Sequence, residues 1–144
     1  MSGLFALQIA ATFVWFGAVF AISFIEAPVK FLAEGLTIEV GVNIGRLVFR
    51  ALHMLELVLL GLLLILQIGL QNGWLWTTGM LIGLAVILLS QVLYLRPTLH
   101  RQATEGGLTQ GISRRKAHHW YIITEVAKLA LLVWLGVSLF GQLS

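Results

Sequence analysis

The sequence contains no cysteine among its 144 residues. The chain therefore has no disulfide framework and no thiolate for a metal or redox site. Charged residues are also scarce, at 10% of the chain, whereas soluble domains carry about a quarter. The groups needed to build a water-facing surface are missing. At 59%, hydrophobic residues are far too frequent for a disordered chain.

Long apolar runs dominate the sequence instead. Asp, Glu, Lys and Arg are all missing from residues 1–25, 57–95 and 129–144. A membrane-spanning helix needs about 20 predominantly apolar residues. Pro28 predicts the end of the first helix, and a turn at 71–73 divides the longest run. The sequence thus predicts four spans, at about residues 4–25, 51–70, 74–95 and 120–140. We expect an all-α protein, an integral-membrane antiparallel four-helix bundle with residues 1–144 in a single domain.

The length of a span forces charged side chains into the membrane. Residues 57–70 are too few to cross, so the second span has to begin near Ala51. Residues 129–144 are also too few, so the fourth span has to begin near Trp120. This extension submerges His53, Glu56, Glu125 and Lys128.

The basic residues predict the orientation. Eight of the nine Lys and Arg residues lie in the connections between the first and second spans and between the third and fourth. They are Lys30, Arg46, Arg50, Arg96, Arg101, Arg114, Arg115 and Lys116. The positive-inside bias places both connections in the cytoplasm and both termini outside. This topology accounts for the formal charge of +3, and we expect no nucleic-acid partner.

The two cytoplasmic connections differ in character. Residues 31–47 are more apolar, with alternating aliphatic side chains, and we interpret them as an interfacial or re-entrant segment. Residues 98–116 contain Gly106-Gly107 and are typical of a solvated loop. Ser113 is a candidate N-cap for a helix that begins at Arg114 and leads into the fourth span.

The submerged polar residues fall on shared helix faces and at a shared depth. The helical rise places Glu56 and Glu125 each about 7–8 Å inside the cytoplasmic edge. An ionised group at the bilayer centre costs roughly 3 kcal/mol, so such groups face the bundle interior and pair. The candidate ligand- or ion-binding residues are Glu56, Glu125, Lys128, His53, Glu26 and Arg50. Two interpretations stay open: a binding site, or a buried clamp that fixes helix register.

Three kinds of chemistry suit these residues. The first is a divalent metal site of carboxylates with a histidine, for which His53, His118 and His119 are the candidate ligands. The second is haem held by two histidines. The third is binding or passage of a proton or small cation, which buried Glu, His and Lys residues commonly carry out.

Short motifs add a family resemblance. The sequence Trp15-Phe16-Gly17 stands near the middle of the first predicted helix. The run Phe24-Ile25-Glu26-Ala27-Pro28-Val29-Lys30-Phe31 follows at its end, and the run Ile44–Phe49 leads into the second. The chain resembles small four-span bacterial membrane proteins of unknown function in the broader copper-resistance protein D-like group. That group is distantly similar to HemJ-type protoporphyrinogen oxidases, which are four-span haem proteins. The resemblance implies a four-helix membrane bundle in a bacterial inner membrane.

One position departs from the oxidase pattern. The HemJ-type proteins carry a haem-liganding histidine seven residues before the tryptophan of the first helix. Gln8 stands at that position here, and glutamine cannot replace an imidazole ligand.

We therefore expect a non-enzymatic membrane protein with a buried Glu/His/Lys site that binds or passes a small ligand or cation. The alternatives are a structural or accessory subunit of a larger membrane complex, and a haem- or metal-dependent membrane redox enzyme. Membrane lipid is the expected surrounding, and Gly79-x-x-x-Gly83 on the third span permits a homo-oligomer or contact with other membrane subunits.

Overall fold

The computed structural model describes residues 2–70, 74–95 and 108–142. Four long helical segments make up these residues, and no strand occurs in the described ranges. The first is α1 (Gly3–Phe20), which continues through the π-helical turn η1 (Ala21–Glu26), the short helix α2 (Ala27–Val29) and the 3₁₀ turn η2 (Lys30–Leu32). The others are α3 (Ile38–Leu70), α4 (Trp74–Ser90) with its π-helical extension η3 (Gln91–Leu95), and α6 (Leu108–Gly141). The all-α prediction is confirmed.

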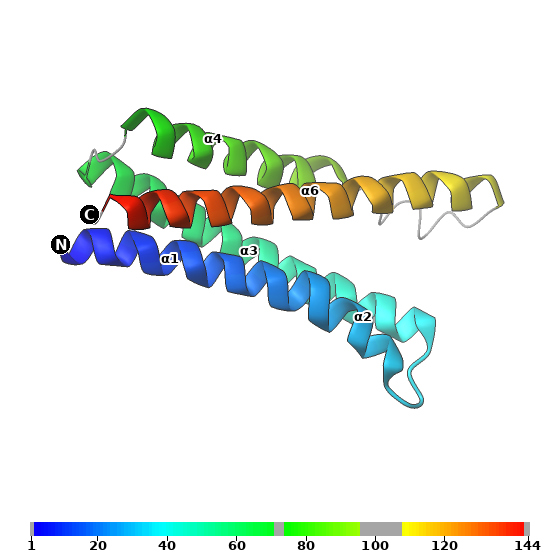
Figure 1. Cartoon of the computed structure of the whole chain (residues 1–144). Coiled ribbons are helices and arrows are strands. Elements are labelled where there is room, and N and C mark those ends of the chain that lie inside the picture. The colour runs from blue at the N-terminus through cyan, green and yellow to red at the C-terminus, as the bar shows by residue number, and fades with distance from the viewer. Residues whose placement is uncertain (1, 71–73, 96–107, 143–144) are drawn as a thin grey trace.

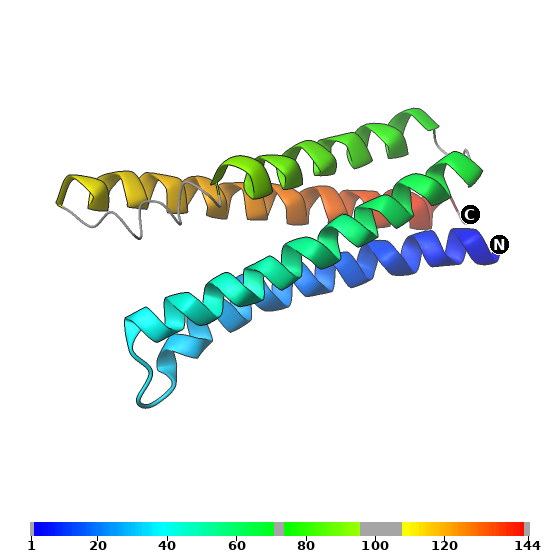
Figure 2. The same ribbon diagram turned by 180° about the vertical axis from the view of Figure 1, so that it is seen from behind.

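The helices surround one elongated core. Helix α1 packs against α3 and α6, and α4 packs against the same two helices, so α1 and α4 lie diagonally opposite. The beginning of α1 and the end of α6 lie at the same end of the molecule (Figure 1). The view from behind shows α3 running alongside α1 over most of its length (Figure 2). Residues far apart in the sequence therefore meet at similar heights in the core.

The helix ends follow from ordinary capping chemistry. The Ser2 hydroxyl accepts a hydrogen bond from the backbone N–H of Phe5, 3.2 Å away, and caps α1. The Thr37 hydroxyl accepts in the same way from the N–H of Val40 at 3.2 Å and starts α3. Gly35 adopts φ +77 in the turn between them, a conformation that side chains with a Cβ rarely adopt. Gly35 and the Thr37 cap thus shape the turn that leads into α3, whereas the Ser2 cap lies at the other end of the first helical segment.

Pro28 does not stop the first helix where the sequence analysis places its end. The backbone passes through Pro28 and stays helical to Leu32. Just before the proline, the N–H of Ala27 bonds to the carbonyl of Ile22 in a π turn. A π turn changes the hydrogen-bonding register, and proline is tolerated near a helix start because it has no N–H to satisfy. Pro28 at this point begins a new short helix.

The second and fourth helices begin earlier than their predicted spans. Helix α3 starts at Ile38, so residues 38–47 are the first turns of the spanning helix and not a separate re-entrant segment. The close approach of Phe31 to Gly41 supports these turns, because a Cβ at Gly41 would lie within 2.4 Å of the phenyl ring. Helix α6 starts at Leu108, before the predicted cap at Ser113. The prediction of a solvated loop at 98–116 is wrong for residues 108–116, which form the first turns of α6. Residues 98–107 lie outside the described ranges.

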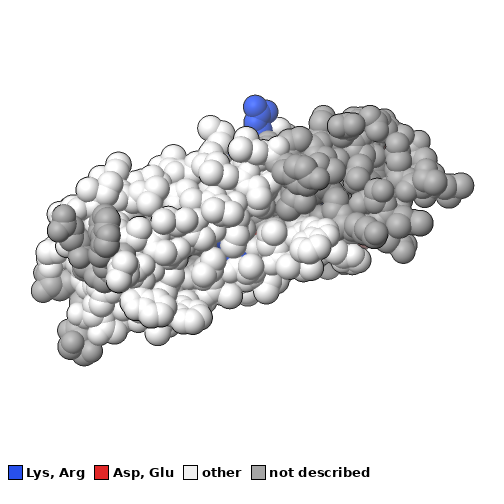
Figure 3. All heavy atoms as spheres, turned by 90° about the horizontal axis from the view of Figure 1, so that it is seen from above, with Lys and Arg blue, Asp and Glu red and all other residues white. Residues whose placement is uncertain are grey.

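Four helices are long and apolar enough to cross a membrane. They are Gly3–Leu32, Ile38–Leu70, Leu75–Leu93 and His119–Gly141. Large apolar side chains cover their outer faces, for example Leu75 at 84% exposed and Trp76 at 73%. The surface face in Figure 3 is almost entirely uncharged between its grey ends. An apolar exterior of this extent is what helices facing acyl chains require.

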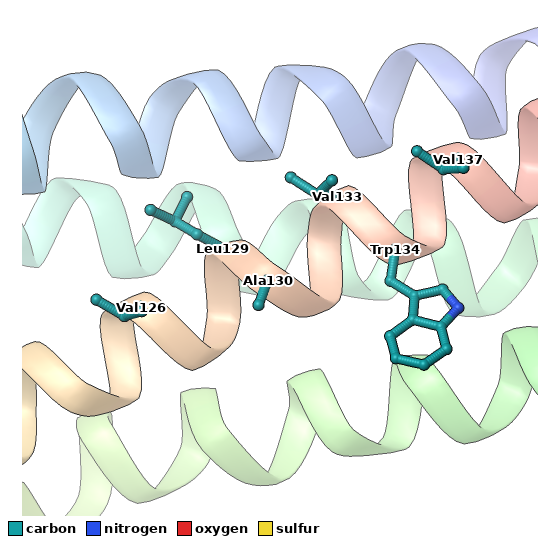
Figure 4. Close-up of a pocket in the computed structure, with 6 residues that line it drawn as sticks. All are labelled: Val126, Leu129, Ala130, Val133, Trp134 and Val137. Carbon is teal, nitrogen blue, oxygen red and sulfur yellow. The ribbon is translucent and has the colours of Figure 1, made fainter.

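The core itself is mainly leucine, packed around Trp15. A shallow groove on the outside of the molecule is also apolar, and α6 residues line it (Figure 4). Its lining residues are Val126, Leu129, Ala130, Val133, Trp134 and Val137. The groove has no charged or hydrogen-bonding group suited to a polar ligand apart from the indole of Trp134. Polar chemistry is therefore concentrated inside the bundle.

Candidate functional site

A cluster of charged side chains lies in the middle of the bundle. Lys128 of α6 lies between Glu56 of α3 and Glu125 of its own helix. Its Nζ is 2.8 Å from Oε2 of Glu56 and 2.7 Å from Oε1 of Glu125. The side chains are 0–2% exposed. The structure thus brings together the three charged residues that span length alone predicts to be submerged.

Gln91 completes the surroundings of the ammonium group. Its side-chain Oε1 accepts a hydrogen bond from Lys128 Nζ at 2.8 Å. Its Nε2 donates to Oε1 of Glu125 at 2.7 Å and to the hydroxyl of Thr124 at 2.8 Å. A lysine ammonium has three N–H donors and no acceptor, and Glu56, Glu125 and Gln91 supply one acceptor group for each. Lys128 is therefore held as a fully hydrogen-bonded cation.

The first helix contributes two neutral donors to the carboxylates. The indole Nε1 of Trp15 donates to Oε2 of Glu56 at 2.7 Å. The hydroxyl of Ser23 donates to Oε2 of Glu125 at 2.6 Å. Trp15 is fully buried. With these two contacts, all four long helical segments take part in the charged cluster.

Two π-helical turns position the neutral partners. Ser23 lies in η1 and Gln91 is the first residue of η3. A π turn changes which face the residues beyond it present, and such turns occur frequently at functional sites. Both π turns here supply a side chain to Glu125. The distortions are thus localised at the cluster.

A histidine and a tyrosine flank the cluster on the side where α3 begins. The Tyr121 hydroxyl lies 2.9 Å from Nε2 of His53. His53 is 1% exposed, whereas Tyr121 is partly exposed. The Phe49 ring meets the Tyr121 ring edge-on, with centroids 5.8 Å apart. The Phe49 ring thus packs against the phenol that bonds to the imidazole.

The charges in the cluster do not balance. Glu56 and Glu125 together carry two negative charges when ionised, and Lys128 carries one positive charge. An uncompensated charge in an apolar interior is strongly unfavourable. The cluster therefore has a place for one further positive charge, either a proton on one of its groups or a bound cation.

The geometry also bears on metal and haem. Ligand atoms of His53, Glu56 and Glu125 lie within 4.8 Å of one another, close enough to share one ion. Lys128 already donates to both carboxylates, so a divalent ion would have to displace its ammonium group. For haem, two buried histidines would have to face each other. His119 is exposed, and the side chain of His118 lies outside the described residues.

Two predicted site residues lie away from the charged cluster. Glu26 pairs with Lys30, with 3.9 Å between Oε1 and Nζ, at a partly exposed position. Arg50 is exposed on α3. Helical spacing places Glu26 and Arg50 on approximately the same helix faces as the cluster residues, but in the structure neither side chain is part of the buried cluster. Side-chain spacing on a regular helix does not reveal this.

Three neutral residues of the cluster do not stand out in the sequence as site residues. Trp15 belongs to the polar face of the first helix, but its contact with Glu56 depends on the packing of α1 against α3. Ser23 and Gln91 are ordinary polar residues within apolar runs, and their roles depend on the π turns. The sequence offers one indication of Ser23 and Gln91, namely that each is a polar residue inside a predicted span.

A second polar contact lies nearer the terminal end of the bundle. Nε2 of Gln8 donates to Oε1 of Gln67 at 2.9 Å, and both side chains are buried. Thr12 is also buried there and donates to the carbonyl of Gln8 at 2.9 Å. Gln8 is therefore an interhelical hydrogen-bonding residue. This pair links α1 to α3.

Removing one member of the Gln8–Gln67 pair is expected to be mildly destabilising. Interhelical hydrogen bonds in membrane proteins contribute about 0.6 kcal/mol on average. A double-mutant cycle with Gln8→Leu and Gln67→Leu, measured as the free energy of unfolding in mixed micelles, should give a coupling energy of about this size. A coupling near zero would mean that the two amides do not meet.

Comparisons of the chain with protein-family models, curated proteins and solved structures find no match.

Proposed function

We propose that this protein is a multi-pass protein of a bacterial inner membrane whose buried Glu/His/Lys cluster binds a small cation. In this proposal the antiparallel bundle has both termini outside, and the cluster lies in its cytoplasmic half. Eight of the nine Lys and Arg residues lie on the chain between the first and second or between the third and fourth predicted spans, which supports the orientation. The resemblance to copper-resistance protein D-like proteins supports the bacterial assignment. The activity is binding, and no catalytic residue is assigned.

The observation that carries the proposal is the unbalanced charge of the cluster. Two buried carboxylates share one ammonium, and every hydrogen bond of that ammonium is already made within the cluster. A purely structural clamp would be most stable with balanced charges, because a surplus buried charge destabilises the fold. The surplus therefore favours a site that takes up a cation over one that only joins helices.

A cation that binds the folded protein raises its melting temperature by mass action. We expect at least one of H⁺, Na⁺, K⁺, Mn²⁺ and Zn²⁺ to raise the melting temperature of the detergent-solubilised protein as its concentration increases. Glu56→Gln should abolish this dependence, because it leaves Glu125 and Lys128 in charge balance. The measurement is a set of melting curves at graded pH and salt.

Glu26→Gln is the matched control, since it removes the same charge from a residue outside the cluster. It should retain the cation dependence of the wild type. If none of the five cations stabilises the wild type more than Glu56→Gln, the cluster binds no cation. The accessory-subunit interpretation, with the charges as a clamp, would then be favoured.

A further inference from the structure

The hydrogen bonds of the two carboxylates are unequal. Both oxygens of Glu125 are engaged, by Lys128, Gln91 and Ser23, at 2.6–2.7 Å. Oε2 of Glu56 accepts from Trp15 at 2.7 Å and lies 2.8 Å from Lys128. Oε1 of Glu56 has a longer contact of 3.0 Å with the same ammonium. The remaining acceptor capacity of the cluster is therefore greatest at Oε1 of Glu56.

The position of Lys128 discriminates between kinds of cation. Its ammonium already occupies the space between the two carboxylates, where a metal ion would need several oxygen or nitrogen ligands. A proton needs only one oxygen atom and no coordination shell. We infer that the cation is a proton, held on Glu56 and exchanged through His53 and Tyr121. This inference rests on the proposed function, since it names the cation that the cluster binds.

A chain of proton-carrying groups leads to Glu56 from one side. The partly exposed Tyr121 hydroxyl is 2.9 Å from Nε2 of the buried His53. A ring nitrogen of His53 lies within 4.8 Å of a carboxylate oxygen of Glu56. One proton passes from the Tyr121 hydroxyl to Nε2 of His53, and a proton from the aqueous side replaces it on Tyr121. A second proton passes from the His53 ring to Glu56. Only O–H and N–H bonds form and break.

On the opposite side of the cluster the packing is mainly apolar, and the buried polar groups there include Thr12 and the Gln8–Gln67 pair. The 11 residues from Glu56 to Gln67 cover about 16 Å at the rise of an α-helix. Buried leucines from three helices occupy the corresponding turns: Leu59, Leu60, Leu63, Leu81, Leu84, Leu132 and Leu135. The structure therefore favours loading of the proton from the Tyr121 end, which the proposed topology places at the cytoplasmic face. It also favours storage of the proton over its passage across the bundle.

The groups that face Glu56 set its proton affinity together. Helix α6 contributes Lys128 and Glu125, and α3 itself contributes His53. The first helix contributes the neutral Trp15, which donates to Glu56. The neutral Gln91 of η3 acts indirectly, because it binds the Lys128 ammonium that contacts Glu56. Lys128 opposes protonation of Glu56, whereas Glu125 and burial favour it.

Infrared spectroscopy of the full chain in lipid vesicles tests the location of the proton. A protonated carboxyl group gives a C=O stretching band that shifts in D₂O. At neutral pH we expect this band in the wild type and in Glu26→Gln, and its loss in Glu56→Gln. Persistence of the band in Glu56→Gln together with its loss in Glu125→Gln would overturn the assignment to Glu56.

The rate at which the band shifts after transfer to D₂O tests the route. We expect His53→Gln to slow the shift by about 100-fold, the lower end of what a positioned proton-transferring side chain contributes. Tyr121→Phe, which removes only the hydroxyl, should slow it in the same direction. Unchanged rates in both variants would overturn the route, and a purely structural role for these residues predicts that result.

The same samples separate the two proposals. If the wild type lacks the band but a metal ion still raises its melting temperature, the proton inference fails and the proposed cation site stands. If the band is absent and none of the five tested cations stabilises the protein, both fail.

Discussion

Replacing Lys128 by methionine is expected to lower the free energy of unfolding by about 3–5 kcal/mol, because it leaves buried charge without a partner. Methionine keeps the length and apolar stem of lysine but removes the ammonium that contacts Glu56, Glu125 and Gln91. The measurement is unfolding in mixed micelles at neutral pH, followed by circular dichroism. No other single substitution discussed here removes so many buried contacts to charged groups.

Lys30→Met is the matched control. Lys30 pairs with Glu26 at 3.9 Å in a partly exposed position, and pairs of this kind contribute about 0–1 kcal/mol. A second variant combines Lys128→Met with Glu56→Gln and Glu125→Gln, so that the cluster carries no charge. It should recover much of the lost stability, since a neutral core avoids the unpaired charges. Equal effects of Lys128→Met and Lys30→Met would contradict the buried ammonium.

Gln91→Leu is expected to have the second largest effect. It removes the acceptor for Lys128 and the donor to Glu125, and hydrogen bonds to charged groups contribute about 1.5–3 kcal/mol each. Leucine also packs well among the neighbouring leucines, which offsets part of the loss. We expect a net loss of about 2–4 kcal/mol in the free energy of unfolding in mixed micelles.

Gln67→Leu controls for the substitution itself. Gln67 is also a buried glutamine, on α3, but it accepts its hydrogen bond from the neutral amide of Gln8. Gln67→Leu should lower the free energy of unfolding by no more than about 1 kcal/mol, as expected for a neutral interhelical hydrogen bond. The difference between the two variants measures the contribution of charge. If Gln91→Leu were as mild as Gln67→Leu, Gln91 would not be bound to the ammonium.

The candidate site was predictable from the sequence for its charged members and for His53. A minimum helix length forced Glu56, Glu125 and Lys128 into the bundle, whatever the packing of the helices. The neutral members depend on contacts between residues far apart in the chain, as in the hydrogen bond from Ser23 to Glu125. Their local sequence carries no comparable signal, because a serine or glutamine is common near a helix end.

The inclusion of Glu26 and Arg50 shows the limit of helical periodicity. Periodicity assumes one regular helix, whereas the first helix contains a π turn at Ala21–Glu26. A π turn alters the register, so a helix face counted from regular spacing does not carry over to Glu26. Arg50 lies a turn and a half before Glu56, and its long side chain is exposed. Long basic side chains commonly extend to a polar surface in this way.

The amino-acid sequence by itself determined the four apolar helices and the submerged charges, because both follow from local composition and from the length a span requires. Tertiary structure decided which partners meet those charges. Packing of four helices and two π turns brings Trp15, Ser23 and Gln91 to the carboxylates and the ammonium. Pairing of this kind depends on the relative rotation of whole helices, which no single segment of sequence specifies.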